Sequence, residues 1–255
     1  MNRAGDQNRP AWVFFDVGNV LLNDDLALAE TYKTLHTAIR HERPEFRFLD
    51  LMAKREELIT LKGDGQPHAT IGREFLGEGG WMALRAQILT KLNENYERYH
   101  IPVSGANRVM KHLAAGYRIG IAANQVRACR EALDKFGLLQ YTSLVWLSED
   151  RGVHKPDPEF YAGFLKEAGC PPEQAVMIGD RLDYDIRPAK AIGMRTVLAR
   201  FRFNVPVEPD EPYVKMYVNS LRRARVSYAR PAGPEETPDH TISSFARLPR
   251  LLAGM

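Results

Sequence analysis

Short apolar runs that alternate with longer amphipathic segments constrain the fold of this 255-residue chain most strongly. Each run is too short for a helix, and most are apolar on both faces, as parallel strands covered by helices should be. The runs are Trp12–Phe15, Ile119–Ala122, Leu144–Leu147, Ala175–Ile178 and Thr196–Leu198. The helical patterns between them lie at roughly 105–115, 125–136, 158–169 and 183–192. This alternation predicts a three-layer α/β/α, Rossmann-like core with a mainly parallel sheet.

Residues 24–100 interrupt the alternation, because they contain no convincing strand. Helical patterns fall at about 26–40, 45–61, 69–77 and 81–99, with a break at "KGDGQPH". We therefore expect a helical domain over 24–100, inserted into a discontinuous core domain of 1–23 and 101–255. Such an insertion can serve either as a packing scaffold or as a lid over the strand ends. We favour a lid that moves on hinges near 23–24 and 101–102, because an insertion after the first strand lies where open α/β sheets bind ligands.

The segments outside this pattern carry weaker signals. The first ten residues are polar and predict a disordered lead-in rather than a secretory signal. In the stretch 200–237, "VPVEPDEP" is typical of a loop, and "YVKMYVNSLRRARVSYAR" predicts a basic helix whose arginines face solvent. "HTISSFARLPRLL" then predicts a last short strand and a helix that close the core domain.

Composition limits the classes of protein that this chain can be. Hydrophobic residues make up 44%, enough for a sizeable core, and 35 basic against 32 acidic residues leave a net charge of only +3. That balance does not indicate nucleic-acid or membrane binding, and the apolar stretches are far below the ~18 residues of a membrane span. The two cysteines, Cys129 and Cys170, give no disulfide framework. We expect a cytoplasmic protein that binds neither nucleic acid nor membranes, and the oligomeric state stays open.

Polar side chains follow the predicted strands at the points where they end. Asp16 follows the first strand, Asn124 the second and Asp180 the fourth, while Lys155 lies in the segment after the third. Asp185 stands shortly beyond Asp180. Because ligands in open α/β sheets bind at the carboxyl ends of the strands, we expect these side chains to converge there.

The predicted convergence indicates a particular chemistry. Carboxylates in one crevice repel each other unless a cation lies between them. Mg²⁺ takes oxygen ligands, so two carboxylates and a backbone carbonyl suffice, and its remaining positions suit waters or a phosphate oxygen. Lys155 would balance the charge and bind the same phosphate. A carboxylate such as Asp16 could then attack phosphorus and form an aspartyl-phosphate.

Four stretches carry a resemblance to a known family. "FFDVGNVL", "IAAN", "KPDPEFY" and "GDRLDYDI" resemble the four ordered motifs of the haloacid dehalogenase-like (HAD) superfamily, over roughly residues 11–198. The gap between the first two motifs is similar in kind to that superfamily's helical, C1-type cap. The resemblance implies a hydrolase with this core, this cap and a magnesium ion.

The resemblance also implies roles for individual residues. Asp16 is then the nucleophile and a metal ligand, and Lys155 orders the nucleophile and the phosphate. Asp180 is a metal ligand, and Asp185 supports the metal directly or through water. The backbone carbonyl of Gly18 would be the remaining protein ligand.

Two residues depart from the pattern of most phosphatases in the superfamily. Gly18 stands where they have a second Asp that protonates the leaving group and activates water, and this loss should reduce the rate by ~10²–10⁴-fold. Ala123 stands where they have a Ser or Thr that donates a hydrogen bond to the phosphate, a loss of ~10–10³-fold. Asn124 could bind the phosphate through its amide and offset part of this. Asp24 and Asp25 could cap the first inserted helix or supply a substitute acid.

The main hypothesis is a Mg²⁺-dependent phosphatase that hydrolyses a small phosphorylated metabolite through phospho-Asp16. The alternative is a weak or silent protein of the same fold that binds a phosphorylated ligand or a protein partner, which Gly18 and Ala123 favour. A dehalogenase would also lack the second Asp but needs no metal, which leaves "GDRLDYD" unexplained. A phosphomutase relies on the missing acid. The substrate is not predictable, because the fold does not name a ligand.

Overall fold

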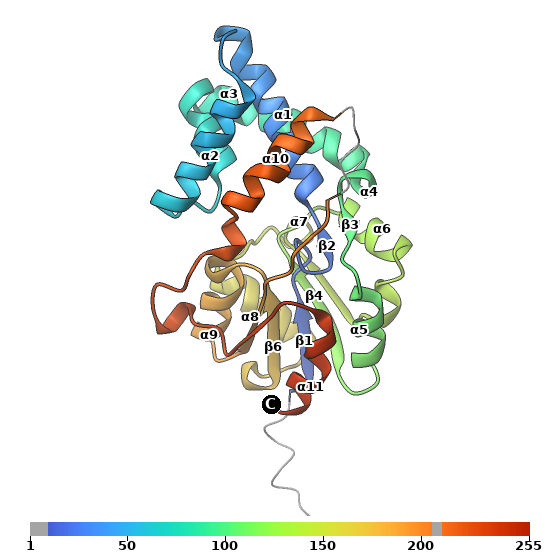
Figure 1. The fold of residues 1–255 in the computed structure, drawn as a ribbon. Helices are drawn as coiled ribbons and strands as arrows, with labels where there is room; N and C mark the ends of the chain where they lie inside the picture. The colour runs from blue at the N-terminus through green and yellow to red at the C-terminus, as the bar shows by residue number, and fades with distance from the viewer. Residues whose placement is uncertain (1–9, 206–210) are drawn as a thin grey trace, which may run out of the picture. The chain divides into compact units, whose positions relative to one another are not determined.

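The computed structural model describes residues 10–205 and 211–255 and divides the chain into two compact units (Figure 1). The core unit comprises the chain up to Asn23, Pro102–Phe203 and Arg230–Met255, and the helical unit comprises Asp24–Ile101 and Asn204–Ala229. Nearly all of the predicted N-terminal lead-in and most of the predicted "VPVEPDEP" loop lie outside the described residues.

The core unit is built on one six-stranded sheet in which every neighbouring pair is parallel. The strands are β1 (Trp12–Phe15), β4 (Arg118–Ala123), β5 (Leu144–Leu147), β6 (Ala175–Gly179), β7 (Arg195–Ala199) and β8 (His240–Ile242). Their order across the sheet is β5-β4-β1-β6-β7-β8. Two short strands, β2 (Leu22–Asn23) and β3 (Ile101–Pro102), pair separately. All five apolar runs and the predicted final strand are therefore confirmed as strands.

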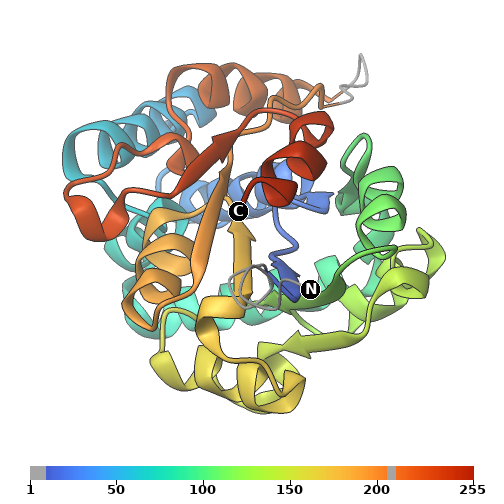
Figure 2. The ribbon, with the colours of Figure 1, turned by 90° about the horizontal axis from the view of Figure 1, so that it is seen from below.

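Helices cover both faces of this sheet, which gives the predicted three layers (Figure 2). The helices of the core unit are α5 (Ala106–Leu113), α6 (Ala128–Lys135), α7 (Ser148–Arg151), α8 (Pro158–Ala168), α9 (Arg187–Ala191) and α11 (Leu248–Ala253). Short turns of helix are η1 (Leu139–Tyr141), η2 (Pro172–Gln174), η3 (Leu182–Ile186), η5 (Pro234–Glu236) and η6 (Phe245–Arg247). The helix predicted over 183–192 is thus two elements, η3 with π-type hydrogen bonding and then α9.

Side-chain alternation along β1 explains why this strand lies at the centre of the core. Its four residues are at most 5% exposed. Phe14 packs against Phe164 of α8, with ring centroids 4.4 Å apart, and Phe15 lies against Phe245, with centroids 6.4 Å apart. Gly120 on β4 makes room for Phe14, because a Cβ there would lie 2.3 Å from the ring. Apolar side chains on both faces fit a strand covered twice by helices.

The helical unit contains no strand between residues 24 and 100, as the sequence predicts. Its elements are α1 (Asp25–Glu42), α2 (Phe48–Lys62), α3 (Pro67–Glu94), α4 (Tyr96–Tyr99), α10 (Pro212–Arg223) and η4 (Val226–Tyr228). The predicted helices over 69–77 and 81–99 are α3, kinked at Gly77 with φ 68°, followed by α4. The positive φ at Gly77 explains why two helices are predicted there, since glycine tolerates this conformation.

The described residues of 204–229 belong to the helical unit, although the sequence analysis assigns this stretch to the core domain. Tyr217 of α10 stacks on Tyr32 of α1, with ring centroids 5.5 Å apart. The basic helix predicted over 213–230 is α10, and it ends earlier than expected, at Arg223. Within the described residues, no helix is long and apolar enough to cross a membrane.

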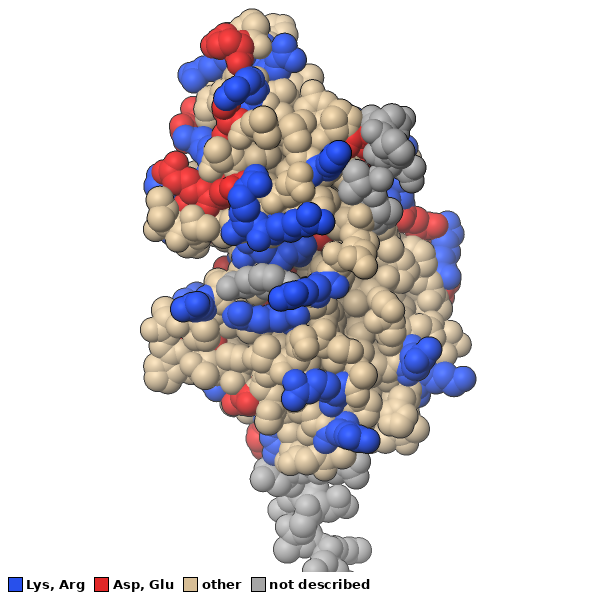
Figure 3. All heavy atoms as spheres, viewed as in Figure 1, with Lys and Arg blue, Asp and Glu red and all other residues tan. Residues whose placement is uncertain are grey.

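In Figure 3, basic and acidic side chains are mixed at the top of the view, and basic side chains gather further down. Exposed ion pairs in this unit include Lys54 with Glu74, at 2.7 Å, and Arg73 with Glu78, at 2.9 Å. Such pairs contribute little to stability. These two pairs therefore add little to the stability of the helical unit.

Candidate active site

Sheet topology selects one edge of the core sheet as the place for a site. Numbered in chain order, the six strands lie in the order 3-2-1-4-5-6, so the direction of winding reverses between β1 and β6. Ligands of open α/β sheets bind at the carboxyl ends of the strands beside this reversal. Asp16 follows β1 and Asp180 follows β6, and the Asp16 amide donates to the carbonyl of Ile178 on β6 at 2.8 Å.

A buried lysine lies between two carboxylates at this edge. The Nζ of Lys155 lies 2.7 Å from Oδ1 of Asp16 and 2.6 Å from Oδ1 of Asp185. The side chains of Lys155 and Asp185 are 1% exposed, whereas that of Asp16 is 15% exposed. Asp16 is therefore the member of the trio that a ligand can reach.

Asp180 completes a cluster of three carboxylates. One oxygen each from Asp16, Asp180 and Asp185 lies within 4.8 Å of the others. Asp180 is 5% exposed. The structure thus brings together Asp16, Lys155, Asp180 and Asp185, four of the residues that the sequence places at the strand ends.

The side chain of Asn124 holds the backbone of Lys155. Its Nδ2 donates to the Lys155 carbonyl at 2.9 Å, and its Oδ1 accepts from the Lys155 amide at 2.8 Å. Sequence reasoning proposed Asn124 as a phosphate ligand and missed this contact, which joins segments that are distant in the chain. The amide carries two N–H groups, so the phosphate contact stays a prediction beside this positioning contact.

Gly179 allows Asp185 to reach the lysine, and sequence reasoning missed its role. A Cβ at Gly179 would lie 2.1 Å from Cγ of Asp185, so any side chain there would displace the carboxylate. The second oxygen of Asp185 accepts from the Arg181 amide at 3.0 Å. The sequence signal was the glycine directly before Asp180 at the end of a strand.

Arg181 and Asp183 form a neighbouring ion pair. The Arg181 Nε and Nη2 donate to the two Asp183 oxygens at 2.8 and 2.5 Å. Burial of Asp183 opposes ionisation, but Arg181 lowers the pKa of its carboxyl. The charge of Asp183 is therefore matched locally, and the excess negative charge belongs to the three clustered carboxylates.

Electrostatics distinguish the two partners at the centre of the site. Burial raises the pKa of Asp16 to about 6, against the opposing attraction of Lys155. Burial favours the neutral form of Lys155, but Asp16 and Asp185 outweigh it and raise its pKa. Lys155 is therefore a permanent cation, and Asp16 is ionised at neutral pH.

The turn after β1 exposes backbone rather than side chain at Gly18. The Val17 carbonyl accepts from the Leu22 amide at 2.9 Å, and the Asn19 amide donates to the Leu22 carbonyl at 2.7 Å. These bonds form a short bridge between Gly18 and Leu22 that does not use the Gly18 carbonyl. Asn19 has φ 54°, so the chain turns sharply here.

The structure also shows the surroundings of Ala123 and of the two aspartates that the sequence offers as helix caps or substitute acids. Ala123 is fully buried, and its methyl group offers no hydrogen bond. Asp25 is buried and pairs with Arg225 at 2.7 Å within the helical unit, so its carboxylate is already engaged. Asp24 stands at the N-cap position of α1, but its side chain makes no capping bond, contrary to the capping interpretation.

The donor set fits a divalent metal ion. Asp16, Asp180 and Asp185 carry two more negative charges than Lys155 neutralises when all are ionised. Hard oxygen donors and this excess charge suit a divalent cation such as Mg²⁺ or Ca²⁺. Both Asp185 oxygens already accept hydrogen bonds, so Asp16 and Asp180 are the better-placed direct ligands. The three aspartates could therefore hold a metal ion.

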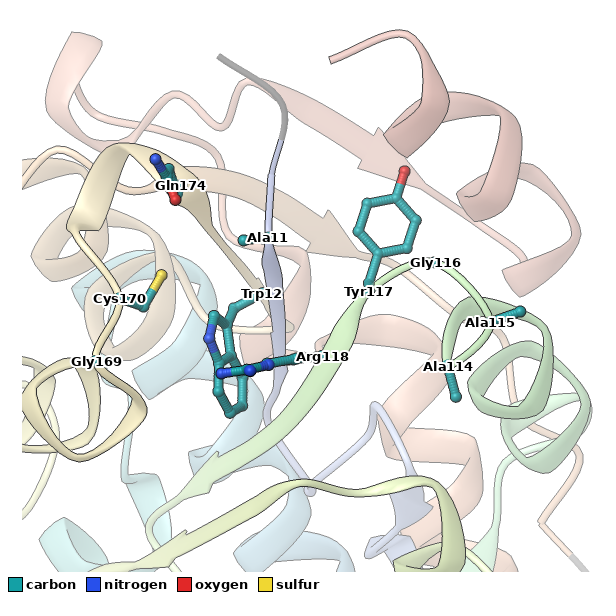
Figure 4. A pocket seen from close by; sticks show the side chains of 10 residues that line it. All are labelled: Ala11, Trp12, Ala114, Ala115, Gly116, Tyr117, Arg118, Gly169, Cys170 and Gln174. Atoms are coloured by element: carbon teal, nitrogen blue, oxygen red, sulfur yellow. The ribbon is translucent and has the colours of Figure 1, made fainter. Parts of the chain in front are cut away.

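A separate cavity of about 490 Å³ lies at the opposite, amino-terminal edge of the sheet (Figure 4). Arg118 lies across the Trp12 ring there, with its guanidinium carbon 5.7 Å from the ring centroid. Cys170 also lines it, and burial raises the pKa of this thiol to about 11, so it is unreactive. This cavity is remote from the carboxylate cluster along the strands and contributes nothing to it.

A parallel α/β core with a lysine-linked carboxylate cluster at its switch point fits the class of hydrolases that the four sequence motifs predict. The model of the haloacid dehalogenase-like hydrolase family matches residues 13–199, and the chain belongs to this family.

Several relatives of this chain are phosphatases. The chain is 35% identical over 217 residues to the glyceraldehyde 3-phosphate phosphatase of Methanocaldococcus jannaschii, with 82% of this chain and 93% of that protein covered. It is 32% identical over 127 residues to the phosphoserine phosphatase of Thermus thermophilus, with 49% of this chain and 51% of that protein covered.

Solved structures confirm the fold. A predicted phosphoglycolate phosphatase from Haemophilus somnus superposes with a TM-score of 0.67 at 16% identity, covering 96% of this chain and 99% of that one. The HAD hydrolase YfnB from Bacillus subtilis, solved with bound magnesium, superposes with a TM-score of 0.61 at 19% identity, covering 96% and 99%. At such identities the likeness concerns the fold alone.

Proposed function

We propose that this protein is a Mg²⁺-dependent phosphatase that hydrolyses a small phosphorylated metabolite through a phospho-Asp16 intermediate. The contact of Asp16 with Lys155 at 2.7 Å, inside the carboxylate cluster, is the observation that carries the proposal. It supplies a reachable nucleophile beside a permanent cation. The phosphatases among the relatives support the same reaction class.

Two transfers make up the proposed reaction. Asp16 attacks phosphorus as the ester or anhydride oxygen leaves, and water then attacks the phosphoryl group and restores the carboxylate. Asp16 must be ionised to attack, which its pKa of about 6 allows at neutral pH. Lys155 neutralises charge on the transferring group, and Asp185 and Asn124 hold Lys155 in place.

A bound Mg²⁺ would neutralise charge on the phosphate oxygens. Asp16, Asp180 and the Gly18 carbonyl would hold it, with Asp185 supporting the site through Lys155 and the Arg181 amide. The hard oxygen donors and the excess negative charge of the cluster support this choice of metal. The helical unit would act as the cap that excludes water during the transfer.

Gly18 shapes the substrate preference that we expect. With no carboxyl at this position, the leaving oxygen must depart without an acid two residues after Asp16. Acyl phosphates, aryl phosphates and sugar 1-phosphates should therefore react faster than simple alkyl esters. The hydrolytic water lacks the same helper, so phospho-Asp16 should accumulate when transfer is fast.

The named relatives give a starting point for the substrate. A phosphorylated three-carbon compound such as glyceraldehyde 3-phosphate, followed by phosphoserine, heads the list of compounds to test. Both are alkyl esters, so they also test the leaving-group argument against the acyl and aryl phosphates.

A second candidate function rests on Gly18 and the buried Ala123. Together they remove the usual acid and one phosphate donor, which favours a weak or silent protein that binds a phosphorylated ligand or a protein partner. The intact Lys155 and its two carboxylate contacts favour the enzyme.

A screen of phosphorylated metabolites with and without Mg²⁺ tests the proposal, with Asp16→Asn as the matched control. We expect metal-dependent phosphate release that disappears in the variant. Graded aryl phosphates should show a steep dependence of rate on leaving-group pKa, with a burst for the best leaving groups. Binding of phosphorylated ligands without any turnover would select the silent-binder alternative.

A further inference from the structure

The described residues of 204–229 are an integral part of the helical unit, although most of the core sheet precedes them in the chain. Val214, Tyr217 and Leu221 of α10 belong to the same buried apolar cluster as residues of α1, α2 and α3. Figure 1 shows α10 beside α1 and α2. The family match ends at residue 199, so this contribution lies outside it.

Arginines tie this segment to the other helices of the unit. Arg55 of α2 donates from Nη1 to the Ser220 hydroxyl at 2.9 Å and to the Ala224 carbonyl at 3.0 Å. Arg223 donates to both oxygens of Glu56, each at 2.7 Å, but its side chain is 56% exposed. The exposed pair with Glu56 matches the predicted solvated face, whereas the contacts of Arg55 are buried.

One ion pair stands apart because of its place in the chain. Nη2 of Arg225 donates to Oδ2 of Asp25 at 2.7 Å, and the two side chains are only 11% and 1% exposed. Asp25 is the first residue of α1 and stands two positions after Asn23, where the chain leaves the core unit. Arg225 stands shortly before Ala229, where the chain returns to it.

The chain passes between the two units at four points, after Asn23, Ile101, Phe203 and Ala229. The Asp25–Arg225 pair joins the first and the fourth passage on the side of the helical unit. On the side of the core unit, the Val103 amide donates to the Leu21 carbonyl at 2.9 Å and joins the first and second passages. The first passage is thus fastened to the fourth and to the second.

We propose that Arg225 is a positioning residue, which holds Asp25 and thereby fixes the first turn of α1, where the helical unit joins the nucleophile loop. A buried ion pair that loses one partner leaves a charge without compensation, so the remaining side chain must move toward water. Loss of Arg225 would then loosen this turn and the adjoining segment in which the chain leaves the core unit. Its effect on catalysis rests on the function proposed above, whereas its effect on α1 does not.

The test compares Arg225→Gln and Asp25→Asn with Arg222→Gln, an exposed arginine near the end of α10. Hydrogen exchange should accelerate about tenfold or more in the first turn of α1 in both pair variants. The Leu28 amide, which donates to the Asp24 carbonyl at 3.0 Å, reports that turn. The kcat of the folded enzyme should fall while its Mg²⁺ affinity stays unchanged, and the control should change neither.

Arg225→Lys keeps the charge and provides a second variant if Arg225→Gln does not fold. We expect it to restore part of the protection in α1. Unchanged exchange in α1 in a folded pair variant would overturn the proposal. A lower unfolding temperature with kcat of the folded fraction preserved would overturn it too, because the pair would then only stabilise the unit. If the protein hydrolyses no phosphate at all, the exchange measurement still decides the role of Arg225.

Discussion

Substitution of Gly179 by alanine tests whether close backbone contact positions Asp185. The new Cβ would lie 2.1 Å from Cγ and 2.3 Å from Oδ2 of Asp185, so the carboxylate must move. Movement endangers its bonds to the Lys155 ammonium at 2.6 Å and to the Arg181 amide at 3.0 Å.

The expected magnitude follows from these contacts. Overpacking in a core costs about 1–3 kcal/mol, and the loss of one hydrogen bond to a charged group costs about 1.5–3 kcal/mol. We therefore expect the free energy of unfolding to fall by about 3–5 kcal/mol. Catalytic activity should fall by a larger factor than the amount of folded protein, because Lys155 loses one of its two carboxylate partners.

Denaturant unfolding followed by circular dichroism measures this loss. Gly116→Ala is the matched control, since a Cβ there meets nothing within 4 Å and its backbone is not in the left-handed region. The decisive comparison places Gly179→Ala in an Asp185→Gly background, which removes the Cβ at 2.3 Å as well as the carboxylate, so most of the penalty should disappear. An equal penalty in both backgrounds would refute the idea that Gly179 exists to admit Asp185.

Three further predictions concern the same site. Asn124→Ala should lower kcat by at least tenfold with little change in Mg²⁺ affinity, because the backbone of Lys155 loses both contacts with the Asn124 side chain. Steady-state kinetics with metal titration measures both quantities, and an unchanged kcat would contradict the prediction. Mg²⁺ affinity measured by calorimetry should fall by up to about tenfold per pH unit below pH 6, since protonation of Asp16 removes a ligand, and a flat profile from pH 7 to 5 would exclude Asp16 as one. Gly18→Asp should raise turnover of alkyl phosphates by restoring an acid, and stopped-flow hydrolysis would show no gain if the new carboxyl cannot reach the leaving oxygen.

The core fold was predictable because its signal is local. Each strand is a short apolar run, and Trp12–Phe15 and Leu144–Leu147 have the predicted bounds. Parallel pairing then forces the polar residues after the strands to one edge, which is how Asp16 and Asp180 could be placed near each other before the structure was known.

Contacts between distant segments were not predictable from local pattern. The apolar face of α10 indicates burial, but nothing in it says against which unit, so residues 204–229 were assigned to the core domain. Asn124 reads as a polar residue at a strand end, and only the structure shows its amide bound to the Lys155 backbone. Asp25 reads as a helix-start acid, whereas burial beside Arg225 gives it a different role.

The most direct test of the account is to trap the covalent intermediate. The protein is mixed with an acyl or aryl phosphate and Mg²⁺, quenched in acid during the first turnover, and analysed by peptide mass spectrometry. The account predicts one added phosphoryl group on the peptide that contains Asp16, and its absence in Asp16→Asn and when the metal is chelated. Turnover without a phosphorylated Asp16, or a phosphoryl group on another residue, would contradict it.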